Sequence, residues 1–163
     1  EELLKEDRRI SYVFQNDSLI PWKNIYNNLK IVVKKHLRGR ELENELDTIL
    51  GVVGLSEFKY YYPYQLSGGM KQRVNLARAL IGEPEIILMD EPFKSLDIKC
   101  KKDIINIVKK FNSEKKITII LVTHDKEEIL NLADMVFLLG ERPVKILYEV
   151  KEKDIKNIIE KIM

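Results

Sequence analysis

The chain has 163 residues, of which 45% are hydrophobic and 33% are charged, and its formal net charge is +2. This length suits one domain with a buried core, and the near balance of acids and bases gives no basic footprint of a nucleic-acid-binding protein. The single cysteine, Cys100, excludes an internal disulfide. No apolar run approaches the ~18 residues of a membrane-spanning helix, so a membrane role would have to come through a partner.

The first half of the chain predicts one strand followed by helices. The segment RISYVFQ, residues 9–15, is rich in strand-forming residues and ends at Gln15. From there to about residue 81 the pattern is helical, over residues 22–37, over 41–55 and from Ser67 onward. We expect His36, in a polar helical stretch, to be an exposed residue without a role in a site.

After residue 84 short continuous apolar runs predict strands. The segments EIILMD (85–90) and ITIILVT (117–123) are typical of strands buried on both faces of a parallel sheet. Two further strands are predicted at MVFLLG (135–140) and VKILYE (144–149).

Two helices are predicted among these strands. The first is long enough to be a crossover connection, and one face of it carries Ile104, Ile105, Val108 and Phe111. The second ends the chain, and its apolar face carries Ile155, Ile158, Ile159 and Ile162. Alternating strands and helices predict an α/β fold with a parallel sheet and a helical insert.

Two acids follow the first of the buried strands. Asp90 and Glu91 stand at its carboxyl end, where α/β sheets bind their ligands. This pair suits Mg²⁺ handling by the first acid and activation of water by the second. Considered alone, the same acids could equally cap the next helix or face solvent.

His124 lies between the end of the next strand and the following helix. Asp125, with Glu128 three residues later, forms a D-x-x-E capping box for that helix. His124 is therefore expected at the carboxyl edge of the sheet, where it could contact a terminal phosphate; an ordinary loop histidine is the alternative.

Two further residues have local patterns that do not decide their role. Gln15 ends a strand at the same predicted edge, which is a weak signal alone. Asp97 is a candidate N-cap for the helix from Ile98, and spacing does not separate that role from a functional one.

Two adjacent glycines, Gly68 and Gly69, begin a strong helix in LSGGMKQRVNLARAL. Each costs up to about 1 kcal/mol relative to alanine inside a helix, so something must compensate. Ser67 is a good N-cap, and the bare N–H groups behind it form a positive helix end suited to a phosphate. A flexible loop would explain glycines but not the helix that follows them.

These motifs, in the order Gln15, LSGGMKQR, IILMDEP, SLD and VTHD, closely resemble the ATP-binding subunits of ABC transporters over nearly the whole chain. The resemblance implies a P-loop NTPase-like parallel sheet core of the ABC ATPase type. Residues 1–15 and 81–163 would form the RecA-like core, and about 16–80 the helical subdomain. The reaction implied is hydrolysis of ATP, with Mg²⁺, by a water that attacks the γ-phosphate.

The resemblance also implies a role for each motif. Gln15 would meet the metal and the attacking water, Asp90 would hold the metal, Glu91 would polarise the water, and His124 would contact the γ-phosphate. The residues expected to meet nucleotide are Ser67, Gly68 and Gly69 of the signature motif, Asp90, and Ser95 and Asp97 of the D-loop. In this family two subunits pair head to tail, so the phosphate at Gly68 and Gly69 would belong to ATP held by the partner.

One departure from the family pattern is severe. The phosphate-binding loop G-x-x-x-x-G-K-[ST] is absent from the 163 residues, and so is the adenine-stacking aromatic expected beside it. In the family the strand that carries this loop lies inside the parallel sheet. We therefore expect a fragment of a longer protein, with either a hole in the sheet or a strand supplied to it; a degenerate subunit is the alternative.

The resemblance implies partners as well as a reaction. It is closest to importer subunits for nitrate, sulfonate, taurine or related small solutes, held at the cytoplasmic face of the membrane by permease subunits. The helical insert would dock the permease, and a solute-binding protein would complete the system. The alternatives are a non-transport ABC ATPase, whose expected coiled-coil insertions or basic arms do not occur here, and a module that lends its signature motif to an active partner.

Overall fold

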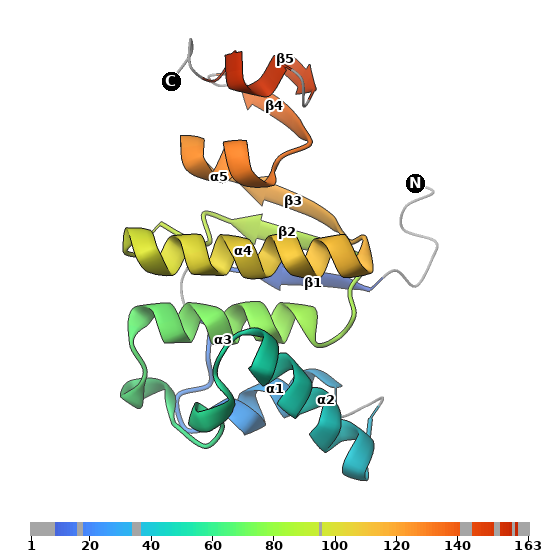
Figure 1. Ribbon diagram of the computed structural model, residues 1–163, viewed down its shortest axis with the longest axis vertical. Helices are drawn as coiled ribbons and strands as arrows, with labels where there is room; N and C mark the ends of the chain where they lie inside the picture. Colours follow the sequence, from blue (N-terminus) through green and yellow to red (C-terminus); the bar gives the residue numbers. More distant parts are fainter. Residues whose placement is uncertain are drawn as a thin grey trace. The chain divides into compact units, whose positions relative to one another are not determined.

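A computed structural model describes residues 9–15, 18–33, 37–94, 96–140, 145–151, 154–157 and 159. His36 and Ser95 lie outside the described residues. The chain divides into two compact units, Glu1–Val122 and Thr123–Met163, which are described separately below. Figure 1 shows the order of their helices and strands along the chain.

The first unit holds a parallel sheet and most of the helices. Its strands are β1 (Ile10–Val13), β2 (Ile86–Asp90) and β3 (Thr118–Val122). Its helices are α1 (Ile25–Val33), α2 (Gly39–Val52), α3 (Gly68–Leu80) and α4 (Ile98–Lys115), with short 3-10 turns η2 (Ser56–Phe58) and η3 (Pro63–Gln65) between α2 and α3. The predicted strands and helices of this part of the chain are thereby confirmed.

The three strands run parallel in the order β1-β2-β3. Val13 pairs with Met89, and Asp90 pairs with Val122. Helix α3 packs on β1, and α4 is the crossover from β2 to β3, which Figure 1 shows running roughly along the strand direction. Side chains on the covered face of the sheet are buried: Val13, Ile87 and Met89 are at most 2% exposed.

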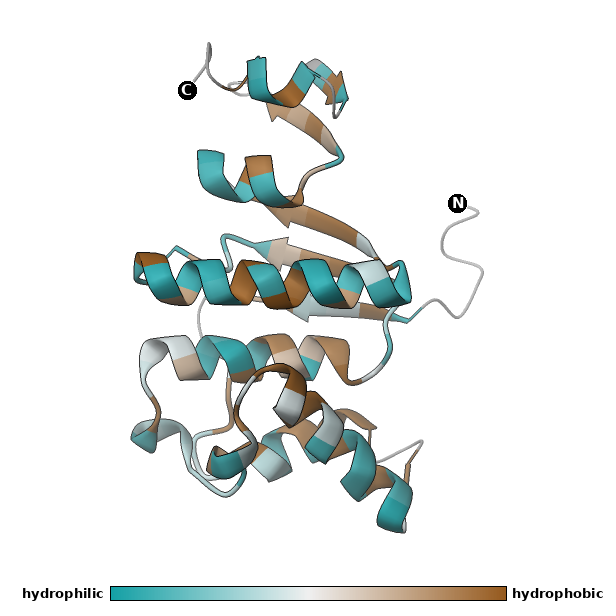
Figure 2. Ribbon diagram, viewed as in Figure 1, coloured by the Kyte–Doolittle hydropathy of each residue, from teal (hydrophilic) through white to brown (hydrophobic). Residues whose placement is uncertain are grey.

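The opposite face of this sheet carries exposed apolar side chains. They alternate with the buried ones along the strands and comprise Ile10, Tyr12, Phe14, Ile120 and Val122, each between 41 and 57% exposed. In Figure 2 strand β3 is brown along most of its length. Among the described residues no strand pairs with the second edge of β3. Parallel sheets ordinarily have both faces covered, whereas this sheet has helices of the first unit on one face.

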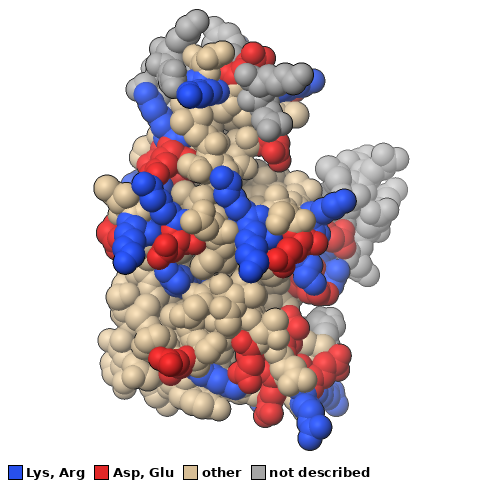
Figure 3. Space-filling model, in the orientation of Figure 1, with Lys and Arg blue, Asp and Glu red and all other residues tan. Residues whose placement is uncertain are grey.

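The helical insert packs around one apolar centre. Helices α1, α2 and α3 contact one another, and Leu29, Leu46 and Leu50 are fully buried. The turns between α2 and α3 place tyrosines at the surface, among them Tyr64 at 78% exposed. In Figure 3 acidic and basic side chains are interspersed on the face in view, so this face has no large patch of a single sign.

The second unit contains α5 (Lys126–Leu132) and an antiparallel pair of strands, β4 (Met135–Leu139) and β5 (Ile146–Lys151). Its core is formed by Ile129, Val150, Ile155 and Ile159. Residues 154–157 and 159 are helical, which agrees with the predicted final helix; Ile158 and Ile162 lie outside the described residues. Among the helices that the structure describes, none is long and apolar enough to cross a membrane.

The two faces of the sheet lead to a matched pair of substitutions. We expect Ile87→Ala, on the covered face, to lower the free energy of unfolding by about 2–5 kcal/mol. Ile120→Ala, on the open face of the neighbouring strand, should cost less than about 1 kcal/mol in this chain. Urea unfolding followed by circular dichroism measures both, and equal costs would show that Ile120 is covered in solution.

Candidate functional site

Three of the predicted site residues meet at the carboxyl edge of the three-stranded sheet. Gln15 lies two residues beyond β1, Asp90 is the last residue of β2, and Glu91 follows it. Because β1 and β2 are parallel neighbours in register, these side chains share one edge. Gln15 and Asp90 are exposed, whereas Glu91 is partly buried. The predicted gathering at this edge is confirmed for these three residues.

Glu91 is held in an unusual backbone conformation. Its φ is +40°, a region that costs a residue other than glycine about 1–3 kcal/mol. The Glu91 N–H donates a hydrogen bond to the Val122 carbonyl at 2.9 Å, which ties this turn to the end of β3. The Glu91 carboxylate forms an ion pair with Lys94, Nζ to Oε2 at 2.5 Å. Because the Lys94 side chain is 48% exposed, we expect this pair to contribute little stability.

The oxygen ligands at this edge suit a magnesium ion. Mg²⁺ prefers oxygen donors, and in nucleotide sites it takes one or two carboxylates together with waters and phosphate oxygens. The exposed Asp90 carboxylate and the Gln15 amide oxygen are donors of this kind on adjacent strands. Among the described residues there is no cluster of three or more His, Cys, Asp or Glu that would hold a metal alone. The two donors therefore fit a Mg²⁺ ion whose remaining ligands are waters and phosphate oxygens.

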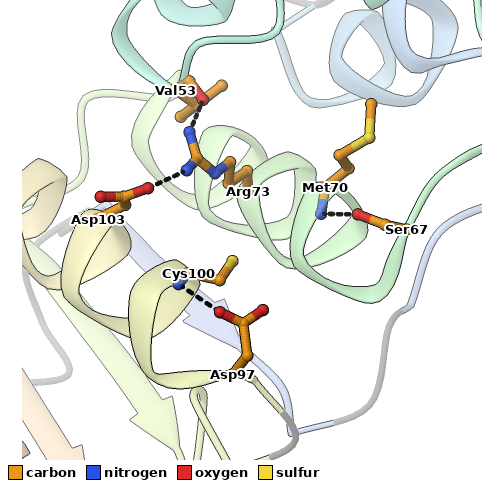
Figure 4. A network of polar contacts seen from close by, with 7 residues as sticks. All are labelled: Val53, Ser67, Met70, Arg73, Asp97, Cys100 and Asp103. Carbon is orange, nitrogen blue, oxygen red and sulfur yellow. Dashed lines mark hydrogen bonds and ion pairs between the residues drawn. The ribbon is translucent and has the colours of Figure 1, made fainter.

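The N-terminus of α3 is built as predicted. Ser67 caps the helix, its Oγ accepting a hydrogen bond from the Met70 N–H at 3.2 Å (Figure 4). Helix α4 begins in the same way, with Asp97 Oδ1 accepting from the Cys100 N–H at 2.9 Å. The cap role predicted for Asp97 is confirmed, and a hollow between the two helix starts is lined by Ser67, Gly68, Gly69, Asp97, Lys99 and Cys100.

The two glycines at the start of α3 have different surroundings. A Cβ atom added to Gly69 would overlap the Cys100 Sγ, so a larger residue here would force the Cys100 side chain on α4 to move. A Cβ atom added to Gly68 would meet nothing within 4 Å in the part of the chain that the structure describes. Packing within the chain thus explains Gly69, but it leaves Gly68 open toward the hollow.

Two predicted residues cannot be placed against this edge. Ser95 is outside the described residues, and His124 belongs to the second unit. Within that unit Asp125 caps α5, its Oδ1 accepting from the Glu128 N–H at 3.1 Å. Glu128 Oε2 accepts a 2.6 Å hydrogen bond from the Thr123 hydroxyl, whose oxygen accepts from the Asp125 N–H. The predicted cap by Asp125 is confirmed, whereas the Asp125 N–H, which a capping box would pair with Glu128, is bonded to Thr123, and Thr123 in turn reaches Glu128.

Three polar residues of α3 were not singled out from the sequence. Gln72 is 6% exposed, and its Nε2 donates to the Pro92 carbonyl at 2.6 Å. Arg78 donates to the Ser18 carbonyl at 2.6 Å, and burial lowers the pKa of its guanidinium. Arg73 contacts both α2 and α4. Gln72 therefore joins α3 to the loop that follows β2, and Arg78 joins it to the loop that follows β1. In the sequence, the signal for such residues is a polar side chain on the apolar face of a predicted helix.

Comparisons with known proteins agree with this geometry. The sequence profile described as ABC transporter matches residues 1–94. The nitrate import ATP-binding protein NrtD of Synechococcus elongatus is 42% identical over 143 residues, covering 86% of this chain and 52% of that protein. The sulfate/thiosulfate import ATP-binding protein CysA of Nocardia farcinica is 38% identical, covering 83% of this chain and 41% of that protein.

A solved structure shows the same fold. It is the ATP-binding cassette MJ0796, a dimer in a post-hydrolysis state bound to ADP and Pi, with a TM-score of 0.76 and 32% identity. The match covers 89% of this chain and 63% of that one. The chain therefore belongs to the ABC transporter family and has the P-loop NTPase fold of its ATPases. It spans about half the length of the relatives named above.

The glycine pair gives a second matched test. We expect Gly68→Ala to be at least as stable as the wild type, because the added methyl group meets open space and alanine favours a helix. Gly69→Ala should be less stable than Gly68→Ala by about 1–2 kcal/mol, because its methyl group overlaps Cys100. Urea unfolding measures the difference. Adding Cys100→Ala to Gly69→Ala should recover most of it, and no recovery would contradict the packing explanation.

Proposed function

We propose that this chain is part of the ATP-binding subunit of an ABC-type importer, which couples ATP hydrolysis to uptake of a small solute such as nitrate, sulfonate or taurine. The observation that carries the proposal is Gly68 at the Ser67-capped start of α3, where an added Cβ atom would meet no other atom within 4 Å among the described residues. The N–H groups of the first turn form a positive helix end that suits a phosphate, and the space beside Gly68 would let one approach. The names of the relatives, which are import ATP-binding proteins for nitrate and for sulfate or thiosulfate, support the importer assignment.

The sheet edge supplies the residues for hydrolysis. Asp90 and Gln15 would hold Mg²⁺, which neutralises charge on the phosphates, and Glu91 would orient and polarise the attacking water. His124 would contact the γ-phosphate, and Ser95 and Asp97 would complete the nucleotide contacts. Because phosphoryl transfer depends mainly on positioning and electrostatics, fixed loops at this edge matter more than covalent chemistry.

The open edge of β3 supports a supplied phosphate-binding loop. Consider a strand that is parallel to β3, pairs with this edge and then connects to β1. Its crossover connection would run across the sheet in the opposite direction to the connections β1-β2 and β2-β3. A right-handed crossover would place its helix on the face that carries Ile120 and Val122. One strand and one helix would therefore cover both the edge and the exposed apolar face. We propose that they carry G-x-x-x-x-G-K-[ST] and lie outside these 163 residues.

The proposed assembly contains a second ATPase subunit, paired head to tail, and permease subunits that hold both at the cytoplasmic face of the membrane. A solute-binding protein would deliver the solute. The insert, about residues 16–80, would dock the permease, and its surface tyrosines such as Tyr60 and Tyr64 are available for that contact. A second candidate, a module that only lends its signature motif, is favoured by the intact Ser67 cap in a chain without a phosphate-binding loop.

Nucleotide binding by the isolated chain is the first test. We expect isothermal titration calorimetry to detect no MgATP binding to a chain that circular dichroism shows to be folded, because the loop that grips the phosphates is outside it. Tight, Mg²⁺-dependent binding would contradict the supplied-loop proposal.

Cross-subunit action is tested by mixing. The chain is added to an intact ABC ATPase subunit whose own signature serine has been replaced, and phosphate release is measured. We expect the wild-type chain to restore activity and Ser67→Arg to fail, because the arginine side chain would fill the hollow before a phosphate reaches Gly68. Equal activity with both chains would contradict the role of Ser67.

Glu91→Gln separates hydrolysis from binding. In the complete ATPase that contains this sequence, we expect the substitution to reduce turnover by at least about a hundredfold, as for loss of a general base. ATP binding should remain, because Glu91 is not proposed to hold the nucleotide. Unchanged turnover would remove Glu91 from the role of water-polarising residue.

A further inference from the structure

We infer that Arg73 is a positioning residue, which fixes the start of α3 against α2 and α4 and so sets where Gly68 is presented. Only the expected effect of Arg73 on catalysis rests on the proposed function; its role in positioning α3 does not. The contacts that support it lie entirely within the first unit.

The Arg73 guanidinium joins three helices. Its Nη1 donates to the Val53 carbonyl at the end of α2, at 3.1 Å, and its Nη2 pairs with Asp103 Oδ2 on α4, at 3.0 Å (Figure 4). The side chains of Arg73 and Asp103 are 21% and 47% exposed, so water partly screens the ion pair, and the directions in which the guanidinium donates matter more than its charge. Only a planar guanidinium presents donors in two fixed directions, and a lysine cannot replace it.

The end of α2 is shaped to receive this guanidinium. Gly54 has a φ of +69°, and the Leu55 N–H donates to the Leu50 carbonyl, as in a glycine-terminated helix. A Cβ atom on Gly54 would lie 3.2 Å from Arg73 Nη1. Glycine therefore serves both the turn and the approach of Arg73, and a cation at the C-terminal end of a helix is favoured by the helix dipole.

The contacts between α3 and α4 are arranged in two layers. Gly69 and Arg73 are four residues apart on α3, and Cys100 and Asp103 are three apart on α4, so each pair shares one side of its helix. Gly69 packs on Cys100, and one turn further along Arg73 pairs with Asp103. The ion pair thereby fixes the helix register that keeps Gly69 closed against Cys100 and Gly68 open.

Cys100 is the only thiol of the chain and reports on this contact directly. We would measure its rate of reaction with Ellman's reagent in the folded wild type, in Arg73→Lys and in Asp103→Asn. Loss of the pair should let α3 and α4 separate and raise the rate roughly 3- to 30-fold in each variant. Because Arg73→Lys retains the positive charge, a faster reaction there reflects geometry. The double variant should react no faster than the faster single one, since both substitutions remove the same contact.

Lys115→Gln is the matched control, because it removes an ion pair with Glu83 at the other end of α4. Its rate should equal that of the wild type. Wild-type rates in both test variants, with circular dichroism unchanged, would overturn the inference. Rates that rise with low concentrations of urea as steeply as global unfolding would overturn it too, because the thiol would then be exposed by unfolding of the whole unit.

The mixing assay gives the catalytic readout. Arg73→Lys should restore less activity than the wild type to the signature-inactive subunit at saturating ATP, whereas Lys115→Gln should restore as much. Full restoration by Arg73→Lys would overturn the positioning role. If the wild-type chain itself restores nothing, the proposed function fails, and the thiol rates still decide whether Arg73 positions α3.

Discussion

The buried hydrogen bond from Gln72 to the Pro92 carbonyl joins the two halves of the candidate site. Helix α3 begins at Gly68, and a turn later Gln72 reaches the loop directly after Asp90 and Glu91. A buried amide that lost this acceptor would cost about 1–3 kcal/mol, so the contact resists separation of α3 from the sheet edge. Through this hydrogen bond, the helix start proposed to contact a partner's phosphate is connected to the loop that carries the chain's own acids.

The parallel sheet is the second constraint on function. Three strands with α3 and α4 on one side bury Ile87 and Met89 but leave Ile120 and Val122 half exposed. The two sides differ because both crossovers within the chain run in the same direction across the sheet, and right-handed connections then place both helices on one face. In the proposed complete protein, a strand connected in the reverse direction would place its helix on the other face. The proposed strand with the phosphate-binding loop would then also cover the exposed apolar side chains.

The backbone is strained at Glu91, the residue proposed to polarise the attacking water. A positive φ at a residue with a side chain persists only where its surroundings hold it, and here the Val122 carbonyl accepts from the Glu91 N–H. Lys94 meanwhile occupies the Glu91 carboxylate. In the proposed reaction the approach of metal and nucleotide would have to compete with a lysine that is itself half exposed. Such a half-exposed pair is weak enough to exchange for other partners.

The sequence by itself determined the strands, the helices, the caps at Ser67, Asp97 and Asp125, and the gathering of Gln15 with Asp90 and Glu91. These follow from local spacing and from the rule that parallel strands end at one edge. Only the tertiary structure separated Gly69 from Gly68, because that difference depends on Cys100, which is far from both in the sequence and lies on another helix. The roles of Gln72 and Arg73 were likewise decided by packing, since a polar residue on a helix has the same local pattern whether it faces water or a distant carbonyl.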